Sequence, residues 1–290
     1  MADPLPISYL NGEFLPLRDA RISPLDRGFL YSDGVYEVMP VYGGRPFRFE
    51  AHASRLTRSL AEIQMSDPHT RHEWREILST LIGRNGGGDQ YVYWQVTRGA
   101  EFGRNHAPLP DVSRTVFAFC APLPVASPAV LENGVACVTA QDTRWARCDI
   151  KSISLLANVL LRQLAVDEGA AETILLRDGE LMEASASAVH VVIGGVILSP
   201  PNSRRILPGT TRSAMEEVAS AAGIPYRATQ VSEAQLRSAD EVWISAATRE
   251  VQPVTRLDGQ PVGSGKPGPL WRRIHDRWQR YKQELAGQPW

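Results

Sequence analysis

A lysine among apolar residues is the first side chain in this sequence that could do covalent chemistry. Lys151 lies in the segment TRWARCDIKSISLLANVL, between Ile150 and Ile153. Apolar surroundings lower the pKa of a lysine amine and free the neutral amine as a nucleophile, the form that makes a Schiff base with a carbonyl compound. A lysine between two hydrophobic segments is also a common surface residue. The position therefore needs partners before it indicates catalysis.

A second segment has the features of an anion site. In RRILPGTTRSAMEEV, Gly209, Thr210 and Thr211 fall at the predicted N-terminus of a helix. Backbone N–H groups, two hydroxyls and the positive end of the helix dipole converge there, which suits a phosphate dianion. The same residues could simply cap the helix. Arg55, on the predicted helix EAHASRLTRSL, could add a fixed positive charge, although alone it is an ordinary helix arginine.

Glu183 and a basic loop complete the candidate residues. Glu183 precedes a largely apolar strand in GELMEASASAVHVV. A buried carboxylate requires a cationic partner, such as a protonated pyridine nitrogen, but Glu183 could equally face water at the start of the strand. In GAEFGRNHAPLP, Arg104 and His106 are two residues apart and would point the same way in an extended chain. Two cationic donors suit a substrate carboxylate, and a solvated basic turn is the alternative.

The elements that must position these residues form two α/β domains, because 290 residues exceed the usual size of one compact core. In the first domain the pattern predicts a hairpin over residues 8–18 that turns at Asn11 and Gly12, and a second hairpin around Gly43 and Gly44. Helices are expected at 50–64 and 69–82, and strands at 90–98 and 114–120.

A change in composition marks the domain boundary. The segment APLPVASPA at 121–129 contains three prolines, which exclude a regular helix or a central strand. It is the expected linker between domains 1–120 and 130–290. Strands are expected in GVACVTAQD, AETILLRDG, LMEASASAVHVVIGGVILSP and EVWISA of the second domain. Its expected helices are SLLANVLLRQLAVDEG, TTRSAMEEVASAAG and PLWRRIHDRWQRYKQEL.

Composition argues against several classes of function. The 31 Lys+Arg against 32 Asp+Glu leave a net charge of -1, so neither nucleic acid nor an anionic membrane is expected as a partner. No apolar run reaches the ~18 residues of a membrane helix, and MADPLPISYLNGEF lacks the features of a secretory signal. Cys120, Cys137 and Cys148 lack the spacing of a disulfide framework or a zinc site. A cytoplasmic protein without a metal is expected.

Seven motifs, in order along the chain, resemble the fold-type IV pyridoxal phosphate (PLP) enzymes. They are DRGFLYSDGVYEVMPVYGG, FEAHASRLTRSL, YWQVTRG with RNH, RWARCDIKSISLLANVL, LMEASASAVHVV, ILPGTTR and ISAATREVQPV. This family includes branched-chain aminotransferases, D-amino-acid aminotransferases and aminodeoxychorismate lyase. RCDIKS and the RNH loop make the resemblance closest to the D-amino-acid (D-alanine) aminotransferase branch. It implies a two-domain α/β (α+β) fold, with a smaller N-terminal α/β domain and a larger C-terminal domain rich in β-strands with flanking helices.

The resemblance also implies roles for individual residues. Lys151 would form the Schiff base with PLP and move a proton between the substrate Cα and C4′ of the cofactor. Glu183 would pair with the pyridine nitrogen, and Leu207 would pack against the ring. The phosphate would be held by Arg55, Gly209, Thr210 and Thr211. Where relatives have hydroxyl residues after the last strand this chain has alanines, so one phosphate contact would be missing beside Ala247 or moved to Thr248.

The family's substrate contacts fall on three further residues. Tyr36 of the GVYE motif would bind the substrate α-carboxylate together with Arg104 and His106. The resemblance implies that a second subunit of a homodimer lends the Arg-His loop. This loop is slightly longer than in relatives, so Arg98 or Arg249 could share its role.

The expected activity is ping-pong transamination between an amino acid and a 2-oxo acid. With the D-type motifs the pair would be D-alanine and 2-oxoglutarate, giving pyruvate and D-glutamate. Alternatives within the family are a branched-chain L-amino-acid transaminase, an (R)-amine transaminase and a lyase such as aminodeoxychorismate lyase. From a different class, a non-catalytic phosphate-binding module would be colourless, whereas PLP on Lys151 would colour the protein yellow.

Overall fold

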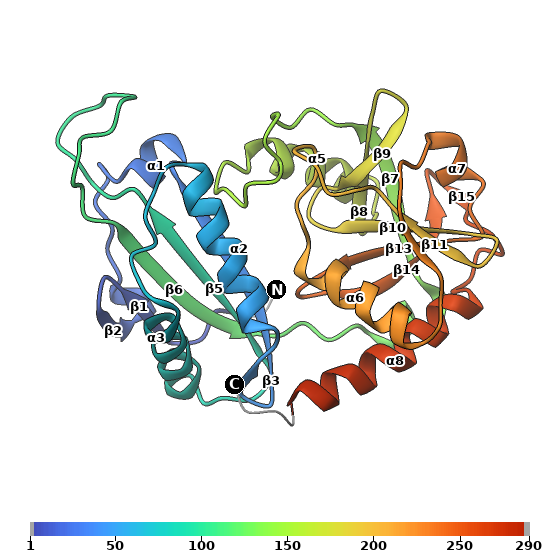
Figure 1. Ribbon diagram of the computed structural model, residues 1–290, viewed down its shortest axis with the longest axis horizontal. Helices are drawn as coiled ribbons and strands as arrows, with labels where there is room; N and C mark the ends of the chain where they lie inside the picture. Colours follow the sequence, from blue (N-terminus) through green and yellow to red (C-terminus); the bar gives the residue numbers. More distant parts are fainter. Residues whose placement is uncertain (1–2, 287–290) are drawn as a thin grey trace. The chain divides into compact units, whose positions relative to one another are not determined.

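The computed structural model describes residues 3–286, which fold into two compact units (Figure 1). Among the described residues, the first unit takes 3–124, 150–154 and 286, and the second takes 125–149 and 155–285. The sequence predicts a single passage between domains, at 121–129. Residues 150–154, which include Lys151, instead return to the first unit because their backbone pairs with one of its strands.

The first unit is built on a six-stranded antiparallel sheet in the order β2-β1-β6-β5-β3-β4. Its strands are β1 (Ile7–Leu10), β2 (Glu13–Pro16), β3 (Gly34–Tyr42), β4 (Arg45–Pro46), β5 (Gln90–Thr97) and β6 (Thr115–Pro122). Both predicted hairpins are confirmed. Asn11 and Gly12 have φ angles of 49° and 99°, and Gly43 and Gly44 have 56° and 80°, the positive values that a tight reversal requires.

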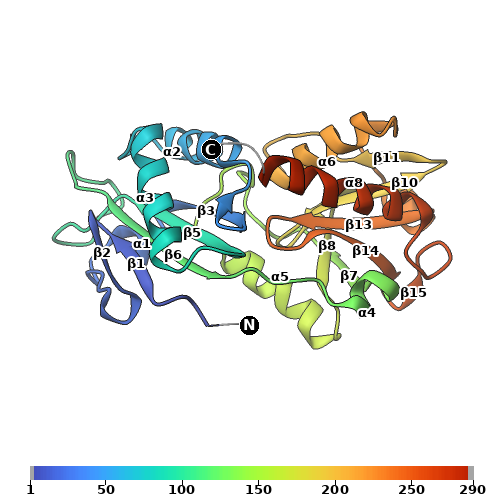
Figure 2. The same ribbon diagram turned by 90° about the horizontal axis from the view of Figure 1, so that it is seen from below.

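Two helices, α2 (Phe49–Glu62) and α3 (Arg71–Arg84), cover one face of this sheet (Figure 2). Both are expected from the apolar spacing. α3 begins later than predicted because Thr70 caps it. The Thr70 hydroxyl accepts from the N–H of Glu73 (3.3 Å), and the Glu73 carboxylate accepts from the N–H of Thr70 (2.6 Å). The helices α1 (Arg27–Tyr31) and η1 (Leu17–Asp19) are too short to show an apolar period, and the sequence does not predict them.

The second unit contains a mixed sheet in the order β12-β11-β10-β13-β14-β7-β8-β9, with β15 paired to β14. Its strands are β7 (Val135–Gln141), β8 (Glu172–Arg177), β9 (Glu180–Ala184), β10 (Ala188–Ile193), β11 (Val196–Ser199), β12 (Tyr226–Ala228), β13 (Glu241–Ala246), β14 (Glu250–Leu257) and β15 (Gln260–Pro261). Three pairings are parallel, those of β11 with β12, β14 with β7 and β7 with β8. The mixture of helices with parallel and antiparallel strands confirms the predicted fold class.

Helices pack on both sides of the second sheet. α5 (Leu156–Asp167) packs on β7 and β8, and α6 (Thr210–Ala221) packs on β12 and β13 on the opposite side (Figure 2). α7 (Glu233–Arg237) and α8 (Pro269–Ala286) complete the unit. Within residues 3–286, no helix is both long and apolar enough to cross a membrane.

The predicted linker at 121–129 is only partly irregular. β6 extends to Pro122, and α4 (Pro128–Asn133) begins within the segment. Proline lacks a backbone N–H, but at the first helical position this costs nothing because that N–H would have no partner within the helix. Ser127 caps the helix, and its side chain accepts from the N–H of Val130. The prediction that prolines exclude a helix or strand throughout this segment is therefore wrong at both ends. Residues 123–127 alone are irregular.

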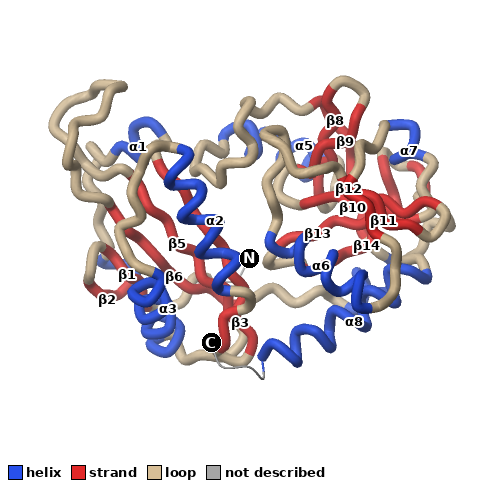
Figure 3. Tube along the Cα trace, viewed as in Figure 1, coloured by secondary structure: helices blue, strands red, loops and turns tan. Residues whose placement is uncertain are grey.

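A long connection joins β5 to β6. Residues 98–114 contain no helix or strand (Figure 3), and the β-bridge described for them joins Ala100 to Asp26. This connection contains Arg104 and His106.

Candidate active site

Lys151 lies on a short segment that extends the edge of β3. Its backbone N–H donates to Oγ of Ser59 (3.2 Å), and its carbonyl oxygen accepts from the N–H of Tyr36 (3.0 Å). The N–H of Ile153 then donates to the carbonyl oxygen of Gly34 (3.1 Å). A glycine is needed there because a Cβ at position 34 would lie 2.7 Å from a carbonyl oxygen of β5. The backbone of Lys151 is therefore fixed by the first unit.

The amine of Lys151 lies over the ring of Tyr36. Nζ is 4.1 Å from the ring centroid, a cation–π distance. Tyr36 also stacks on Tyr93, with centroids 5.5 Å apart, and burial raises the pKa of the Tyr93 hydroxyl. Lys151 is half-buried. The structure thus brings together Lys151 and Tyr36, two of the predicted site residues.

Arg55 takes part in a buried ion pair that the sequence did not reveal. Its Nε and Nη2 donate to the two oxygens of Glu37 at 2.7 and 2.8 Å, and Nδ1 of His52 lies 2.8 Å from the same carboxylate. Burial opposes the ionisation of Glu37, but Arg55 and His52 lower its pKa to about 2, and burial lowers the pKa of His52. Glu37 shares the inward face of β3 with Val35 and Met39. A carboxylate at a position where the alternating pattern of the strand calls for an apolar residue was the signal that could have identified Glu37 as a buried, paired residue.

Glu183 is a buried carboxylate with two kinds of donor. Both of its oxygens accept from the backbone N–H of Leu207, at 3.2 Å each, and Oε1 accepts from Nη1 of Arg144. Burial raises the pKa of Glu183, and Arg144 opposes that rise. The open alternative that Glu183 faces water is wrong, since it is 7% exposed. Leu207 meets Glu183 through its backbone.

Arg144 is a functional candidate that the sequence did not indicate. Its Nε and Nη2 donate to the two oxygens of Asp142 at 2.9 and 3.0 Å, and Arg177 lies 2.9 Å from the same aspartate. Arg177, Asp142, Arg144 and Glu183 therefore form a chain of ion pairs in which positive and negative side chains alternate. The sequence offers no spacing that would have paired Arg144 with Glu183, because β-strand register and the loop before Lys151 bring them together.

The predicted anion site lies at the start of α6. Gly209 is the N-cap, in an extended conformation, and Thr210 and Thr211 begin the helix, each 7% exposed. The first turn, TTRS, contains no acidic residue, so the positive end of the helix dipole is not offset locally. A Cβ at position 209 would lie 3.3 Å from the Cβ of Arg212, which favours glycine at this cap. The structure brings these three predicted residues together.

The residues after β13 form a tight turn into β14. Ala246 ends β13, and its carbonyl oxygen accepts from the N–H of Arg249 (3.0 Å). Ala247 and Thr248, both half-buried, occupy this turn. The guanidinium of Arg249 donates to the carbonyl oxygen of Ala171 (3.2 Å).

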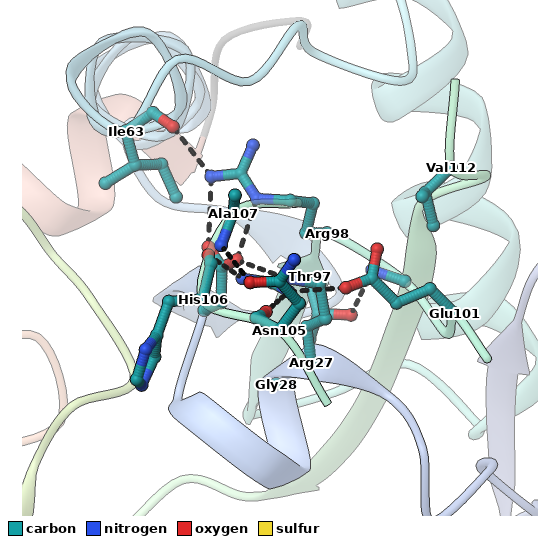
Figure 4. Close-up of polar contacts among 12 residues, drawn as sticks. Arg27, Gly28, Ile63, Thr97, Arg98, Glu101, Asn105, His106, Ala107 and Val112 are labelled. Atoms are coloured by element: carbon teal, nitrogen blue, oxygen red, sulfur yellow. Dashed lines mark hydrogen bonds and ion pairs between the residues drawn. The ribbon is translucent and has the colours of Figure 1, made fainter. Parts of the chain in front are cut away.

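Arg104 and His106 are held against a different tyrosine from the one beneath Lys151. The Arg104 guanidinium lies 5.2 Å from the ring centroid of Tyr31, and the His106 ring lies 5.5 Å from it. Both side chains are exposed. Arg98, the suggested substitute, instead donates to both oxygens of Asp33 at 2.7 and 3.0 Å and to the carbonyl oxygen of Ile63 (Figure 4). Arg98 is therefore engaged at the base of the loop.

Comparison with known proteins gives a consistent family. The family model for class IV amino-transferases matches residues 34–257. The chain is 38% identical over 280 residues to the D-alanine aminotransferase of Listeria monocytogenes serotype 1/2a (strain 10403S), covering 96% of this chain and 95% of that protein. It is also 38% identical over 274 residues to the D-alanine aminotransferase of Staphylococcus aureus (strain MSSA476), covering 94% and 96%.

Solved structures of the same family share the fold. The branched-chain amino acid aminotransferase of Escherichia coli has a TM-score of 0.89 at 26% identity, covering 97% of this chain and 94% of that one. A fold IV-transaminase from Curtobacterium pusillum has a TM-score of 0.80 at 25% identity, covering 96% and 94%. The likeness in fold therefore extends over nearly the whole chain.

Proposed function

This chain belongs to the class IV aminotransferases, and from that premise we propose that it transfers the amino group of D-alanine to 2-oxoglutarate, giving pyruvate and D-glutamate, with PLP as cofactor. The observation that supports this most is the identity of 38% to D-alanine aminotransferases over almost the full length of both chains. The branched-chain enzyme of Escherichia coli, although similar in fold, is 26% identical.

The residues present suit PLP, which carries an aldehyde, a ring nitrogen and a phosphate. Lys151 offers an amine on a backbone fixed by two hydrogen bonds. Glu183 offers a buried carboxylate for a protonated ring nitrogen. Thr210 and Thr211 offer buried hydroxyls at a helix N-terminus for the phosphate. When bound, PLP supplies the electron sink that makes the Cα proton of an amino acid labile.

Lys151 has two tasks in this proposal. It would hold PLP through its amine, and the same amine would carry the proton that leaves or returns to the substrate Cα. Both tasks require an amine that returns to one place. The bonds from the Lys151 backbone to Ser59 and Tyr36 fix the base of the side chain. The Tyr36 ring, 4.1 Å from Nζ, supports its end.

Glu183 is proposed to keep the ring nitrogen protonated. A carboxylate does this only while it is itself ionised, and burial opposes ionisation. Arg144 and the N–H of Leu207 supply the compensating donors. Leu207 is proposed to pack its side chain against the ring. Arg55, Gly209, Thr210, Thr211 and the turn residues Ala247 and Thr248 are proposed as the phosphate site.

The substrate carboxylate is proposed to bind Tyr36 of one subunit and Arg104 and His106 of the other. Arg104 and His106 are exposed on the loop and contact Tyr31 rather than Tyr36, which suits side chains that serve a second copy of the chain. An exposed apolar face on α5 supports a homodimer. Its members are Leu156 (73% exposed), Val159 (60%), Leu160 (63%), Leu164 (45%) and Val166 (53%).

The location is proposed to be the cytoplasm. Cys120, Cys137 and Cys148 are free and buried, as in proteins that keep their thiols reduced.

The reaction with single amino donors tests the activity. The purified holoenzyme is mixed with D-alanine, L-leucine or (R)-1-phenylethylamine without an acceptor, and loss of the bound cofactor's visible absorbance is followed. D-alanine should bleach the absorbance and release pyruvate, and 2-oxoglutarate should restore it. Turnover of L-leucine without turnover of D-alanine would contradict the proposal. Continuous release of pyruvate with no acceptor would indicate a lyase.

The covalent site is tested separately. Borohydride reduction of the holoenzyme should fix the label on the peptide that contains Lys151, and Lys151→Ala should abolish the label. Lys266→Ala is the matched control, because Lys266 is bonded only to the Asn133 side chain near α4 among the contacts described. A label on any other lysine would overturn the assignment.

A further inference from the structure

The loop that contains Arg104 and His106 is anchored by a buried arginine on α1. Nε of Arg27 donates to Asp33 (2.9 Å), and Nη1 donates both to Glu101 (2.5 Å) and to the carbonyl oxygen of Asn105 (2.7 Å). Nη2 donates to the carbonyl oxygen of His106 (2.9 Å) (Figure 4). Two of the four acceptors are consecutive carbonyls of the loop, so the planar guanidinium fixes the path of its backbone.

Glu101 closes the loop at its base. Oε1 accepts from Arg27, and Oε2 accepts from the N–H of Leu109 (2.9 Å). The hydrogen bond from Leu109, followed by the contact with Arg27, lowers the pKa of Glu101. One carboxylate therefore joins the two sides of the loop, eight residues apart, and ties both to α1.

Arg27 is itself held in place by the neighbouring Asp33 and by contacts on the side away from the loop. Asp33 accepts from Nε of Arg27 and also binds Arg98, whose Nη2 reaches the carbonyl oxygen of Ile63. The neighbouring Asp26 accepts from the N–H of Gly28 (2.7 Å) and from two threonine hydroxyls of β5 and β6 (2.7 and 2.5 Å). Because Arg27 is 3% exposed and tied to the sheet on this side, its other side can act as a rigid support for the loop.

Tyr31 provides a surface against which the loop's side chains lie. Its ring centroid is 4.7 Å from Cζ of Arg27, 5.2 Å from Cζ of Arg104 and 5.5 Å from the ring centroid of His106. The same tyrosine therefore contacts the arginine that fixes the backbone and the two side chains proposed to bind substrate. A shift of one residue in the loop would turn these side chains away, since only alternate residues of an extended segment point the same way.

We propose that Arg27 and Glu101 are positioning residues that clamp the loop at Asn105 and His106, and so set the carboxylate affinity of the enzyme through Arg104 and His106. This inference rests on the proposed function. Neither Arg27 nor Glu101 touches substrate in this proposal. Their effect should fall on ligands that carry a carboxylate, namely the amino acid and the 2-oxo acid alike.

Arg27→Lys tests the clamp, because lysine keeps the charge but cannot span Asp33, Glu101 and two carbonyls. The KM values for D-alanine and for 2-oxoglutarate should each rise about tenfold or more, with kcat changed by less than about threefold, the pattern of lost binding shared by ground state and transition state. The cofactor's absorbance and the borohydride label should be retained. Arg114→Lys is the matched control, since Arg114 lies at the far end of the loop and, among the described residues, donates to the carbonyl oxygen of Val112.

Glu101→Gln gives a conservative second variant. Arg27 and Leu109 donate to different oxygens of Glu101, so the side-chain amide would set its NH2 group, a donor, against one of them. The KM values should therefore rise in the same direction by a smaller factor. An unchanged KM in both variants would overturn the clamp. So would parallel loss of kcat and bound cofactor, because that result would indicate a general structural role.

The hand of the substrate does not affect this result. If the wild-type enzyme used L-leucine instead of D-alanine, the proposed function would fail. The clamp would then be judged by the KM for 2-oxoglutarate, which both activities share.

Discussion

Tyr36 and Lys151 share a backbone hydrogen bond of 3.0 Å, in which the tyrosine N–H donates to the lysine carbonyl. The Tyr36 ring also lies under the Lys151 amine. The main chain of Tyr36 thus fixes the backbone of Lys151, and the ring of Tyr36 contacts the Lys151 amine. A residue proposed to bind the substrate carboxylate and the residue proposed to hold the cofactor therefore cannot move independently of each other.

The other backbone bond of Lys151 can be removed by itself. In Ser59→Ala, the Lys151 N–H loses its acceptor, and the free energy of unfolding should fall by about 1 kcal/mol, the usual worth of one such bond. We expect kcat to fall several-fold while the cofactor stays attached. Chemical denaturation and steady-state kinetics measure the two effects. Ser54→Ala, on the same helix, removes an exposed hydrogen bond from Arg71 instead and should leave kcat unchanged.

Arg144→Met tests whether the partner of Glu183 keeps it ionised. Removing one member of a buried ion pair leaves an uncompensated charge, so the free energy of unfolding should fall by about 3–5 kcal/mol. Without Arg144 the pKa of Glu183 should rise further, so a larger fraction of this carboxylate should be protonated. We expect kcat to fall by about 100-fold, the scale of losing one electrostatic contact at a reacting centre. Raising the pH should recover part of kcat. Arg205→Met, which breaks an exposed pair with Asp178, should change neither quantity.

Acid should weaken the first unit through Glu37. Its pKa is about 2 in the folded chain against 4.5 for an ordinary glutamate, so this contribution is complete above pH 4.5 and is lost as pH falls towards 2. A shift of this size corresponds to about 3 kcal/mol. His52 acts in the same direction, because its pKa is lowered by burial and protonation favours the unfolded chain below its ordinary value.

Denaturation between pH 7 and pH 3 measures this dependence. Glu37→Gln should be less stable at pH 7 and should show a flatter decline in acid. Glu50→Gln, an exposed glutamate on the same helix as Arg55, serves as the control. A decline as steep in Glu37→Gln as in the wild type would place the acid sensitivity elsewhere.

The apolar face of α5 should hold the proposed dimer together. Leu160→Lys places a charge on this face, and sedimentation should show a shift from dimer to monomer with the unit still folded. Transamination should be lost with the dimer. Val125→Lys changes a residue that is 84% exposed but lies outside α5, and it should leave the sedimentation unchanged.

Mixed dimers test which subunit lends the loop. Lys151→Ala and Arg104→Ala chains should each be inactive alone. Mixing them should restore activity, because one of the two sites in the hybrid then has an intact Lys151 and an intact loop. No recovery on subunit exchange would mean that both residues act within a single chain.

The elements with a clear period or turn were predictable. Asn11 with Gly12 fixed one hairpin, and the spacing of Leu56 and Leu60 indicated α2. The start of α6 at Thr210 was likewise evident from a polar segment before a helical pattern. These features are local, so a short stretch of sequence contains all the information that determines them.

The contacts that position the candidate residues were not predictable in the same way. Arg144 meets Glu183, and Arg27 meets Glu101, through loops and register rather than through spacing in the chain. Nor did the neighbours of Lys151 indicate that residues 150–154 pair with β3. Such long-range partners depend on the whole fold. A buried glutamate such as Glu37 can be recognised locally, because it interrupts the apolar positions of its strand.

The return of residues 150–154 to β3 has a consequence for the order of events during synthesis. Until the ribosome has made Ile153, the Gly34 end of β3 is an open sheet edge, with N–H and C=O groups available to another chain. The segment that later presents Lys151 also covers that edge. A chain that ends before residue 150 therefore keeps this edge open to pairing with a strand of a second chain.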